Sequence, residues 1–258
     1  MRLLYIALMF YTRIPTPPVK DFRPEDTNRT TRCFSLVGWI VGVICCIGFM
    51  AGNWLFGLPA GVVIALAAGV ATTGCFHEDG FADMIDGFGG GNGDRLKILD
   101  IMKDSRIGSF GTIALILMFS LKIFTLISIM SDGAVAGTWA VPLIFVTYHA
   151  AARMTAGSMV FISRYSRDDG TSKVKPVEKG WTWREALGLY LFGLIPVAAA
   201  AVADWRISLV LPLLALILLF FRRFCEKRIG GYTGDCLGAL EQLSEIAILL
   251  FIVIILKF

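Results

Sequence analysis

One long stretch without charged side chains constrains the fold of this chain more than any other feature. Residues 33–77 contain no Asp, Glu, Lys or Arg over 45 positions, and residues 133–152 and 186–203 form further uncharged runs of 20 and 18. A helix needs roughly 20 predominantly apolar residues to cross the hydrocarbon core of a bilayer. These runs therefore predict membrane-spanning helices rather than a water-soluble domain.

The overall composition indicates the same class of protein. Charged residues make up 17% of the 258 positions, where about 25% is usual for soluble domains. A net charge of +4 is too small for a protein held to nucleic acid by its overall charge. We expect a single all-α, polytopic membrane domain that covers residues 1–258, has the lipid bilayer as a partner and binds no nucleic acid.

About seven helices are expected to cross the membrane. Two of the candidate spans are short, so a re-entrant or strongly packed helix is the alternative there. Gly57-Leu58-Pro59 predicts a tight hairpin between the first two spans, and small residues such as Gly38 and Gly42 suit close helix contact in lipid. The spans are 34–56, 60–76, 110–131, 137–160, 186–203, 207–224 and 239–256.

The distribution of basic residues predicts the orientation in the membrane. Segments 1–32, 77–109, 161–185 and 222–238 together carry 20 of the 24 Lys and Arg residues. Because cytoplasmic loops are enriched in Lys and Arg, we place these segments on the cytoplasmic side of the inner membrane, with the C-terminus outside. Residues 1–11 are interpreted as an interfacial or re-entrant helix rather than a cleaved signal, and the six cysteines as buried or cytosolic thiols.

An acidic segment after the second span is the first candidate functional site. Residues 77–104 hold seven of the 20 acidic residues. Asp79, Asp83 and Asp86 are spaced i, i+4 and i+7, so they fall within an arc of about 60° on one helix face. The plainer alternative is a solvated acidic helix, but these acids follow directly on an uncharged span, which favours a metal site.

Two further acids complete the predicted metal site. Asp100 and Asp104 are again four residues apart and are expected to face the first three. Clustered carboxylates repel one another unless a cation lies between them, and carboxylate oxygens suit Mg²⁺. Two close metal ions on such a set would suit phosphoryl transfer. The predicted Mg²⁺ ligands are Asp79, Asp83, Asp86, Asp100 and Asp104.

Glycines and cations lie between and beside these acids. Five of the seven residues from Gly87 to Gly93 are glycine, which indicates either a flexible turn or a backbone that approaches phosphate through Gly89 and Gly90. Lys103 and Arg106 are candidates to hold phosphate oxygens, Arg106 with a bidentate fork. Their alternative role is anchoring at the cytoplasmic membrane surface.

A second glycine-rich cluster opens the last helix. It runs from Gly230 to Ala239, and exposed amides at a helix N-terminus favour an anion. The last helix then carries Glu241 and Glu245, which are either partners of the helix dipole or ligands.

Three polar residues outside these clusters are further candidates. His77 borders the acids as a general base or ligand, whereas His149 is interpreted as a packed or hydrogen-bonded residue. Arg153, if buried, needs a carboxylate or phosphate partner.

The motifs taken together resemble one family, the cobalamin synthases or adenosylcobinamide-GDP ribazoletransferases. The resemblance runs nearly end to end and rests on separated motifs in the same order. They are Thr12-Arg13-Ile14-Pro15, the run from His77 to Gly91, Met102 to Gly111 and Gly231 to Ala239. Many members have a hydrophobic residue at the position of Glu78, a difference with little expected effect on activity.

The resemblance implies the last assembly step of adenosylcobalamin. In that reaction the 5′ oxygen of alpha-ribazole, or of its phosphate, attacks the phosphorus of adenosylcobinamide-GDP next to the aminopropanol, GMP leaves, and magnesium is required. The implied catalytic residues are His77, Asp79, Asp83, Asp86, Lys103, Asp104 and Arg106. The implied substrate-binding residues are Arg13, Gly89, Gly90, Ser105, Arg153, Thr233, Gly234 and Asp235.

Two other functions are compatible with parts of the pattern. The acids are similar to those of CDP-alcohol phosphotransferases, but Asp83 stands where those enzymes have Arg after Ala82. A cation carrier would place its acids at the midplane of its spans, whereas here they cluster at the inner mouth. A homo-oligomer or a biosynthetic complex is compatible with the sequence as well.

Overall fold

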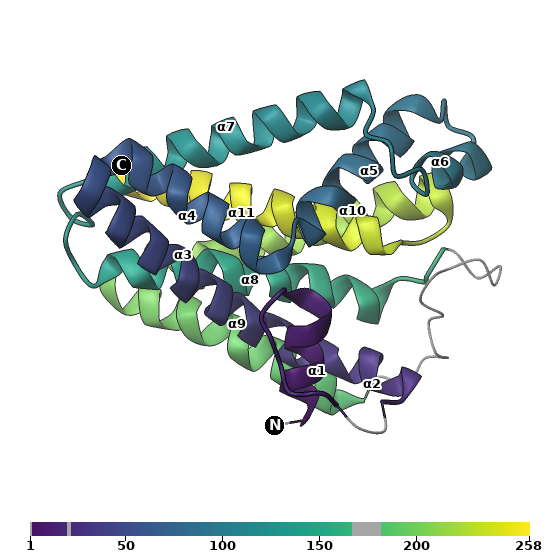
Figure 1. Cartoon of the computed structure of the whole chain (residues 1–258), viewed down its shortest axis with the longest axis horizontal. Coiled ribbons are helices and arrows are strands. Elements are labelled where there is room, and N and C mark those ends of the chain that lie inside the picture. The colour runs from purple at the N-terminus through teal and green to yellow at the C-terminus, as the bar shows by residue number, and fades with distance from the viewer. Residues whose placement is uncertain (1, 20–21, 167–181) are drawn as a thin grey trace.

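The computed structural model describes residues 2–19, 22–166 and 182–258, and this part of the chain is helical (Figure 1). Its one strand-like pairing is a single bridge between Tyr165 and Tyr232, so the expected all-α class is confirmed. In chain order the helices are α1 (Arg2–Tyr11), α2 (Pro24–Arg29), η1 (Thr30–Cys33), α3 (Phe34–Phe56), α4 (Leu58–Thr73), α5 (Phe76–Gly90), α6 (Arg95–Ile101), α7 (Ser109–Ser131), α8 (Ala140–Ile162), α9 (Trp183–Ala203), η2 (Trp205–Leu209), α10 (Val210–Ile229) and α11 (Gly234–Lys257).

The polytopic character is confirmed, with a smaller number of clearly apolar spans than expected. Each of the seven expected spans coincides with one long helix. The α4–α5 pair, which is bent by 88° at its break, can be counted as one more span beside the five segments of the described chain that are long and apolar enough on their own. Those five are Asp26–Phe56, Ser109–Ser131, Trp183–Ala203, Trp205–Ile229 and Gly234–Lys257.

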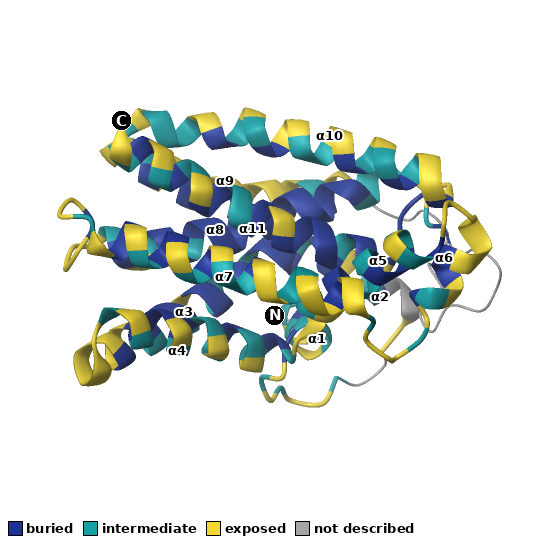
Figure 2. Cartoon of the chain, turned by 90° about the horizontal axis from the view of Figure 1, so that it is seen from above, coloured by how far each residue is buried: buried dark blue, intermediate teal, exposed yellow. Residues whose placement is uncertain are grey.

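Helix α8 is the expected span that neither the five apolar segments nor the bent α4–α5 pair includes. It has 23 residues and packs against α3, α9 and α11. Every residue from Thr147 to Met159 is buried, and Figure 2 shows α8 and α11 dark between exposed outer helices. His149 and Arg153 lower the hydropathy of α8, which is tolerated because protein rather than lipid surrounds the helix.

Glycines allow the central helices to approach closely. A Cβ at Gly38 or Gly42 of α3 would lie 2.6 or 2.7 Å from the carbonyl oxygen of His149 or Phe145 in α8. Gly57, with a φ of 86°, forms the expected hairpin between α3 and α4. These contacts confirm the predicted role of small residues in helix packing.

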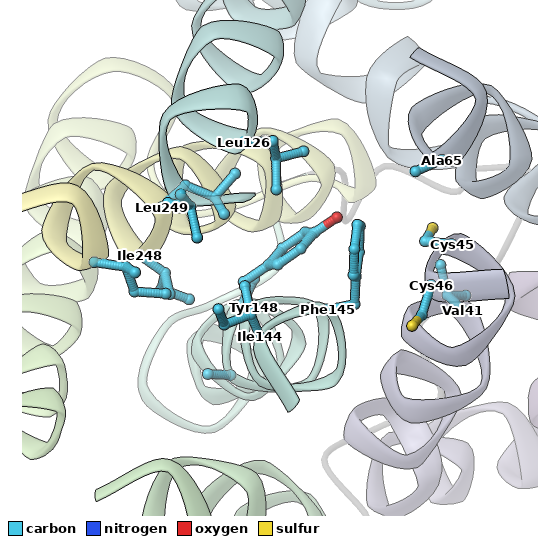
Figure 3. Packing of buried hydrophobic residues seen from close by; sticks show 14 of the residues in the cluster. Val41, Cys45, Cys46, Ala65, Leu126, Ile144, Phe145, Tyr148, Ile248 and Leu249 are labelled. Atoms are coloured by element: carbon cyan, nitrogen blue, oxygen red, sulfur yellow. The ribbon is translucent and has the colours of Figure 1, made fainter. Parts of the chain in front are cut away.

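The apolar core fills the space between α3, α8 and α11. Figure 3 shows Phe145 and Tyr148 of α8 between Cys45 of α3 and Leu249 of α11. Lipid tails are as apolar as these side chains, so close packing rather than transfer out of water holds such helices together. Apart from the exposed Cys75, the cysteines are buried and none forms a disulfide.

The N-terminal helices lie near the same end of the bundle as α5 and α6 (Figure 2). The apolar helix α1 buries Ile6 and Ala7, and Arg2 pairs with Asp26 at 2.6 Å. Five of the basic residues used for the orientation lie outside the described residues, namely Lys20, Arg167, Lys173, Lys175 and Lys179.

Candidate active site

The acidic helix α5 begins at a sharp break in the chain. Gly74 and Cys75 both adopt left-handed backbone conformations, with φ of 68° and 61°. A left-handed glycine is a common way to end a helix, and here two such residues in succession end α4 and turn the chain by 88°. The break places the predicted acids at one end of the bundle instead of inside a straight span.

The three acids of α5 share a face but differ in environment. Asp79 is exposed, Asp83 is half-buried and Asp86 is buried. The carboxylate of Asp86 accepts hydrogen bonds from the amides of Gly108 at 2.7 Å and Gly111 at 2.9 Å. Because these amides belong to the first turn of α7, Asp86 satisfies donors that a helix N-terminus leaves unpaired.

The cationic loop before α7 lies against α5 through these contacts. Arg106 donates to Asp104 from Nε at 3.0 Å and from Nη2 at 2.6 Å. These hydrogen bonds lower the pKa of Asp104 to about 2 and raise the pKa of Arg106, so both groups are charged near neutral pH. Lys103, Ser105 and Asp100 are also exposed at this end.

The glycine run is mostly helical. Gly89 and Gly90 form the last residues of α5, and the run leaves the right-handed region at Asn92 and Gly93, whose φ angles are 52° and 81°. A Cβ at Gly89 would lie 2.8 Å from the Phe110 ring, and one at Gly90 would lie 3.2 Å from Ile101. These glycines thus let α6 and the start of α7 pack closely against α5.

The N-terminal motif meets α5 at its break. The amide of Arg13 donates to the carbonyl of Thr72 at 2.7 Å. The side chain of Arg13 lies against Gly74, where a Cβ would be 2.3 Å from its Nε. Arg13 itself is exposed, so its charge is available beside the acids.

The C-terminal motif also contacts α5. Thr233 is buried and caps α11 through its hydroxyl, which accepts from the amide of Cys236. A Cβ at Gly80 would lie 2.9 Å from the Cα of Asp235, and one at Gly238 would lie 2.9 Å from the carbonyl of His77. Residues far apart in the sequence are therefore brought together at this end.

Next to the acids lies a largely buried ionic cluster, in which Glu78 is half-buried. It is defined here as His77, Glu78, Lys122, His149, Arg153, Glu241, Gln242 and Glu245. Arg153 pairs with Glu241 at 2.7 Å, which is the carboxylate partner that a buried arginine requires. Lys122 pairs with Glu245 at 2.6 Å, and His149 Nδ1 lies 2.5 Å from Glu245. The carboxylates of α11 therefore balance cations from α7 and α8, an arrangement that the sequence did not predict.

Gln242 joins the two halves of the cluster. Its amide oxygen accepts from Lys122 at 2.5 Å, and its amide nitrogen donates to Glu241 at 2.8 Å and to Glu78 at 3.3 Å. The sequence signal for this cluster was the presence of Lys122 and Arg153 inside apolar spans, since ionisable residues there need partners.

One group in the described chain brings three ligand atoms within 4.8 Å of one another, and it consists of His149, Glu241 and Glu245. All three residues are buried. Their carboxylates are already paired with Arg153 and Lys122. The group is therefore an ion-pair network, although its side chains are of types that also bind metal ions.

Comparison with known proteins identifies the family. Residues 3–253 match the family model for cobalamin-5-phosphate synthase. Proteins named adenosylcobinamide-GDP ribazoletransferase from Shewanella amazonensis, Shewanella frigidimarina and Shewanella baltica are 40%, 37% and 42% identical to this chain. The alignments cover 99%, 98% and 95% of this chain and 96%, 94% and 90% of the relatives. No solved structure matches, but the sequence matches confirm the resemblance of the motifs, and the chain belongs to the cobalamin-5-phosphate synthase family.

Proposed function

We propose that this chain is an adenosylcobinamide-GDP ribazoletransferase that uses Mg²⁺ at the acidic face of α5. Membership of the family and the shared name of relatives along the whole chain support the activity. The observation that carries the location is the contact between α5 and the start of α7. Asp86, on the same helix as Asp79 and Asp83, accepts from the amides of Gly108 and Gly111, and the loop that ends at Gly108 carries the exposed Lys103 and Arg106. This is the arrangement that a diphosphate substrate with its metal ion requires.

The acidic face fits Mg²⁺ better than the buried group does. Mg²⁺ prefers oxygen ligands and keeps several waters, and Asp79 and Asp100 are exposed whereas Asp83 and Asp104 are partly accessible. The buried group offers an imidazole and two carboxylates that already pair with cations. We assign the Mg²⁺ to the five predicted aspartates, where it would neutralise charge on the diphosphate.

Cations and amides at the same end would orient the substrate. Lys103, Arg106 and Arg13 are exposed there, and the N-terminus of α11 adds amides that favour an anion. We assign contacts with adenosylcobinamide-GDP to these groups together with Ser105, Gly89, Gly90, Thr233, Gly234 and Asp235. Arg153 is 1% exposed, so its contribution would pass through Glu241 and the position of α5.

The transfer is proposed as a single displacement. The 5′ hydroxyl oxygen of alpha-ribazole forms the new bond to phosphorus, the bond from that phosphorus to GMP breaks, and GMP leaves with the electron pair. The hydroxyl proton passes to an exposed carboxylate such as Asp79, or to His77, which is only 2% exposed. No Ser or Cys in the described site has a base beside it, so a covalent enzyme intermediate is not proposed.

The direct test is an assay of the purified protein in detergent. Adenosylcobinamide-GDP and alpha-ribazole should yield adenosylcobalamin and GMP in equal amounts, with activity lost in EDTA and restored by Mg²⁺. A chiral thiophosphate substrate should give inversion at the transferred phosphorus. Full activity in EDTA would contradict the role of Mg²⁺, and retention would contradict single displacement.

We place the protein in the inner membrane as one domain over residues 1–258, with the acidic end on the cytoplasmic side. The basic residues of segments 77–109 and 222–238, at the same end as the acids, support this orientation. The further proposed partners are a second copy of this chain, in a homo-oligomer, or the other proteins of a biosynthetic complex. The lipid-facing helices are accessible to such partners.

A further inference from the structure

A small cavity lies at the inner side of the α4–α5 break. Its volume is about 20 Å³, and roughly 10–15 Å³ is enough for one water molecule. The cavity is therefore large enough for one water molecule or one small ion. Its polar lining consists of Thr73, Glu78, Lys122, His149, Arg153, Gln242 and Glu245.

The charges around this cavity do not balance. Glu241 is matched by Arg153 and Glu245 by Lys122, whereas no cation of the described residues lies within 4.0 Å of Glu78. With both imidazoles neutral and all three carboxylates ionised, the two cations leave one net negative charge around the cavity. An uncompensated charge is costly inside a membrane protein.

The unmatched carboxylate has an oxygen available for a ligand. Glu78 Oε1 accepts from Gln242 at 3.3 Å, but Glu78 Oε2 is buried without a hydrogen-bond partner. His149 also lines the cavity, is 6% exposed, and has a buried Nε2 without a partner. Because its Nδ1 faces Glu245 as a donor, a neutral His149 keeps a lone pair on Nε2.

The end of α4 adds to the preference for a positive charge. Gly69, Val70 and Thr73, from the last turns of α4, line the cavity. The C-terminal end of a helix carries partial negative charge. In membrane proteins, the ends of interrupted helices near buried acids are a recurrent setting for monovalent cations.

We infer that this cavity binds one small monovalent cation, Na⁺, between Glu78 and the end of α4. One positive charge neutralises the cluster, whereas a divalent ion would add an excess charge beside Lys122 and Arg153. The carboxylates of Glu241 and Glu245 already have cationic partners, so the ion lies on the Glu78 side. This site is separate from the Mg²⁺ proposed at the surface, and its test requires no catalytic activity.

Thermal unfolding of the full chain in detergent tests the inference. At fixed pH and ionic strength, replacing choline chloride with NaCl should raise Tm in a saturable manner, because a ligand that binds only the folded state stabilises it. Binding of ²²Na⁺ to the wild-type protein should saturate at one ion per chain. A Tm that does not distinguish Na⁺ from choline, or a lack of ²²Na⁺ binding, would overturn the inference.

Variants locate the ion. Glu78→Gln should fold, because the cluster is then neutral without an ion, and should lose both the Na⁺-dependent rise in Tm and the ²²Na⁺ binding. Thr73→Val should weaken Na⁺ binding at least several-fold, and it is the variant to test if Glu78→Gln does not fold. Asp132→Asn, which removes a charge from the loop after α7 and keeps an acceptor for the amide of Ala134, should retain the full response. Unchanged Na⁺ binding in Glu78→Gln, or a response to Mg²⁺ or Zn²⁺ instead of Na⁺, would contradict the site.

Discussion

At the scale of single residues, three acids that look equivalent in the sequence have different surroundings. Asp79 and Asp83 face the accessible end of the bundle, whereas both oxygens of Asp86 accept from amides at the start of α7. A carboxylate can accept more than two hydrogen bonds. Asp86 can therefore accept from the amides of α7 and bind a metal ion at the same time. The two roles predict different effects of the same substitution.

Replacing these acids by asparagine separates the two roles. Asp79→Asn, at an exposed acid, should reduce kcat by about 100-fold or more through lost metal binding, with Tm unchanged. Asp86→Asn should lose activity and also stability, by about 1.5–3 kcal/mol, because hydrogen bonds to a charged group are lost. Activity assays and thermal unfolding in detergent check both, and an Asp86→Asn protein as stable as wild type would contradict its capping role.

Arg106 has a matched counterpart elsewhere in the chain. Arg106 pairs with Asp104 two residues before it at 2.6 Å, and Arg206 pairs with Asp204 in the same way at 2.7 Å. Arg106→Lys should lower kcat/KM for adenosylcobinamide-GDP about tenfold, because Lys lacks the bidentate fork. Arg206→Lys should leave kcat/KM unchanged, so equal effects of the two substitutions would contradict a substrate contact at Arg106.

At the scale of secondary-structure elements, the site depends on how closely α5 and α11 approach. Gly80 of α5 faces the backbone of Asp235, and Gly238 of α11 faces the carbonyl of His77. Backbone atoms cannot move aside as a flexible side chain can. The two glycines therefore set the distance between the acidic helix and the C-terminal motif.

Adding one methyl group at this contact should displace the helices. Gly80→Ala should destabilise the protein by about 1–3 kcal/mol, although Ala favours a helix over Gly by about 1 kcal/mol. The displacement should also lower kcat at least tenfold, since small misplacements of a site are costly. Gly133→Ala, where a Cβ has no atom within 4 Å, is the control, and equal stability of the two variants would contradict the close contact.

At the scale of the whole molecule, the two ends of the bundle have different characters. One end gathers α5, α6 and the start of α11, and the opposite end carries the loop after α7 (Figure 2). Helix α7 has 23 residues, so at 1.5 Å per residue the ends are about 34 Å apart. That distance matches the hydrocarbon thickness of a bilayer.

Labelling of single cysteines tests the orientation. In a cysteine-free background, Lys97→Cys on α6 should resist impermeant thiol reagents in intact cells and react in inverted vesicles. Gly133→Cys at the opposite end should show the reverse pattern, because positive residues mark the cytoplasmic side. Labelling of Lys97→Cys in intact cells would place the acidic site outside and contradict the proposed sidedness.

The sequence alone determined the helical, polytopic architecture and the acidic face of α5. Apolar runs and i, i+4, i+7 spacing are local properties, because the geometry of one helix fixes them whatever surrounds it. The positions of Asp79 and Asp83 followed from that geometry. The family motifs are also local features of the sequence, so they could be recognised without the structure.

Only the tertiary structure decided which polar groups are partners. His149 and Glu245 are 96 positions apart and lie 2.5 Å from each other, and Asp86 serves a helix that begins 23 residues later. Spacing in the sequence does not predict such pairs, because the fold sets the distance between side chains from different helices. The same reason explains α8, an expected span whose residues from Thr147 to Met159 are buried, because its polar side chains are stable only where other helices cover them.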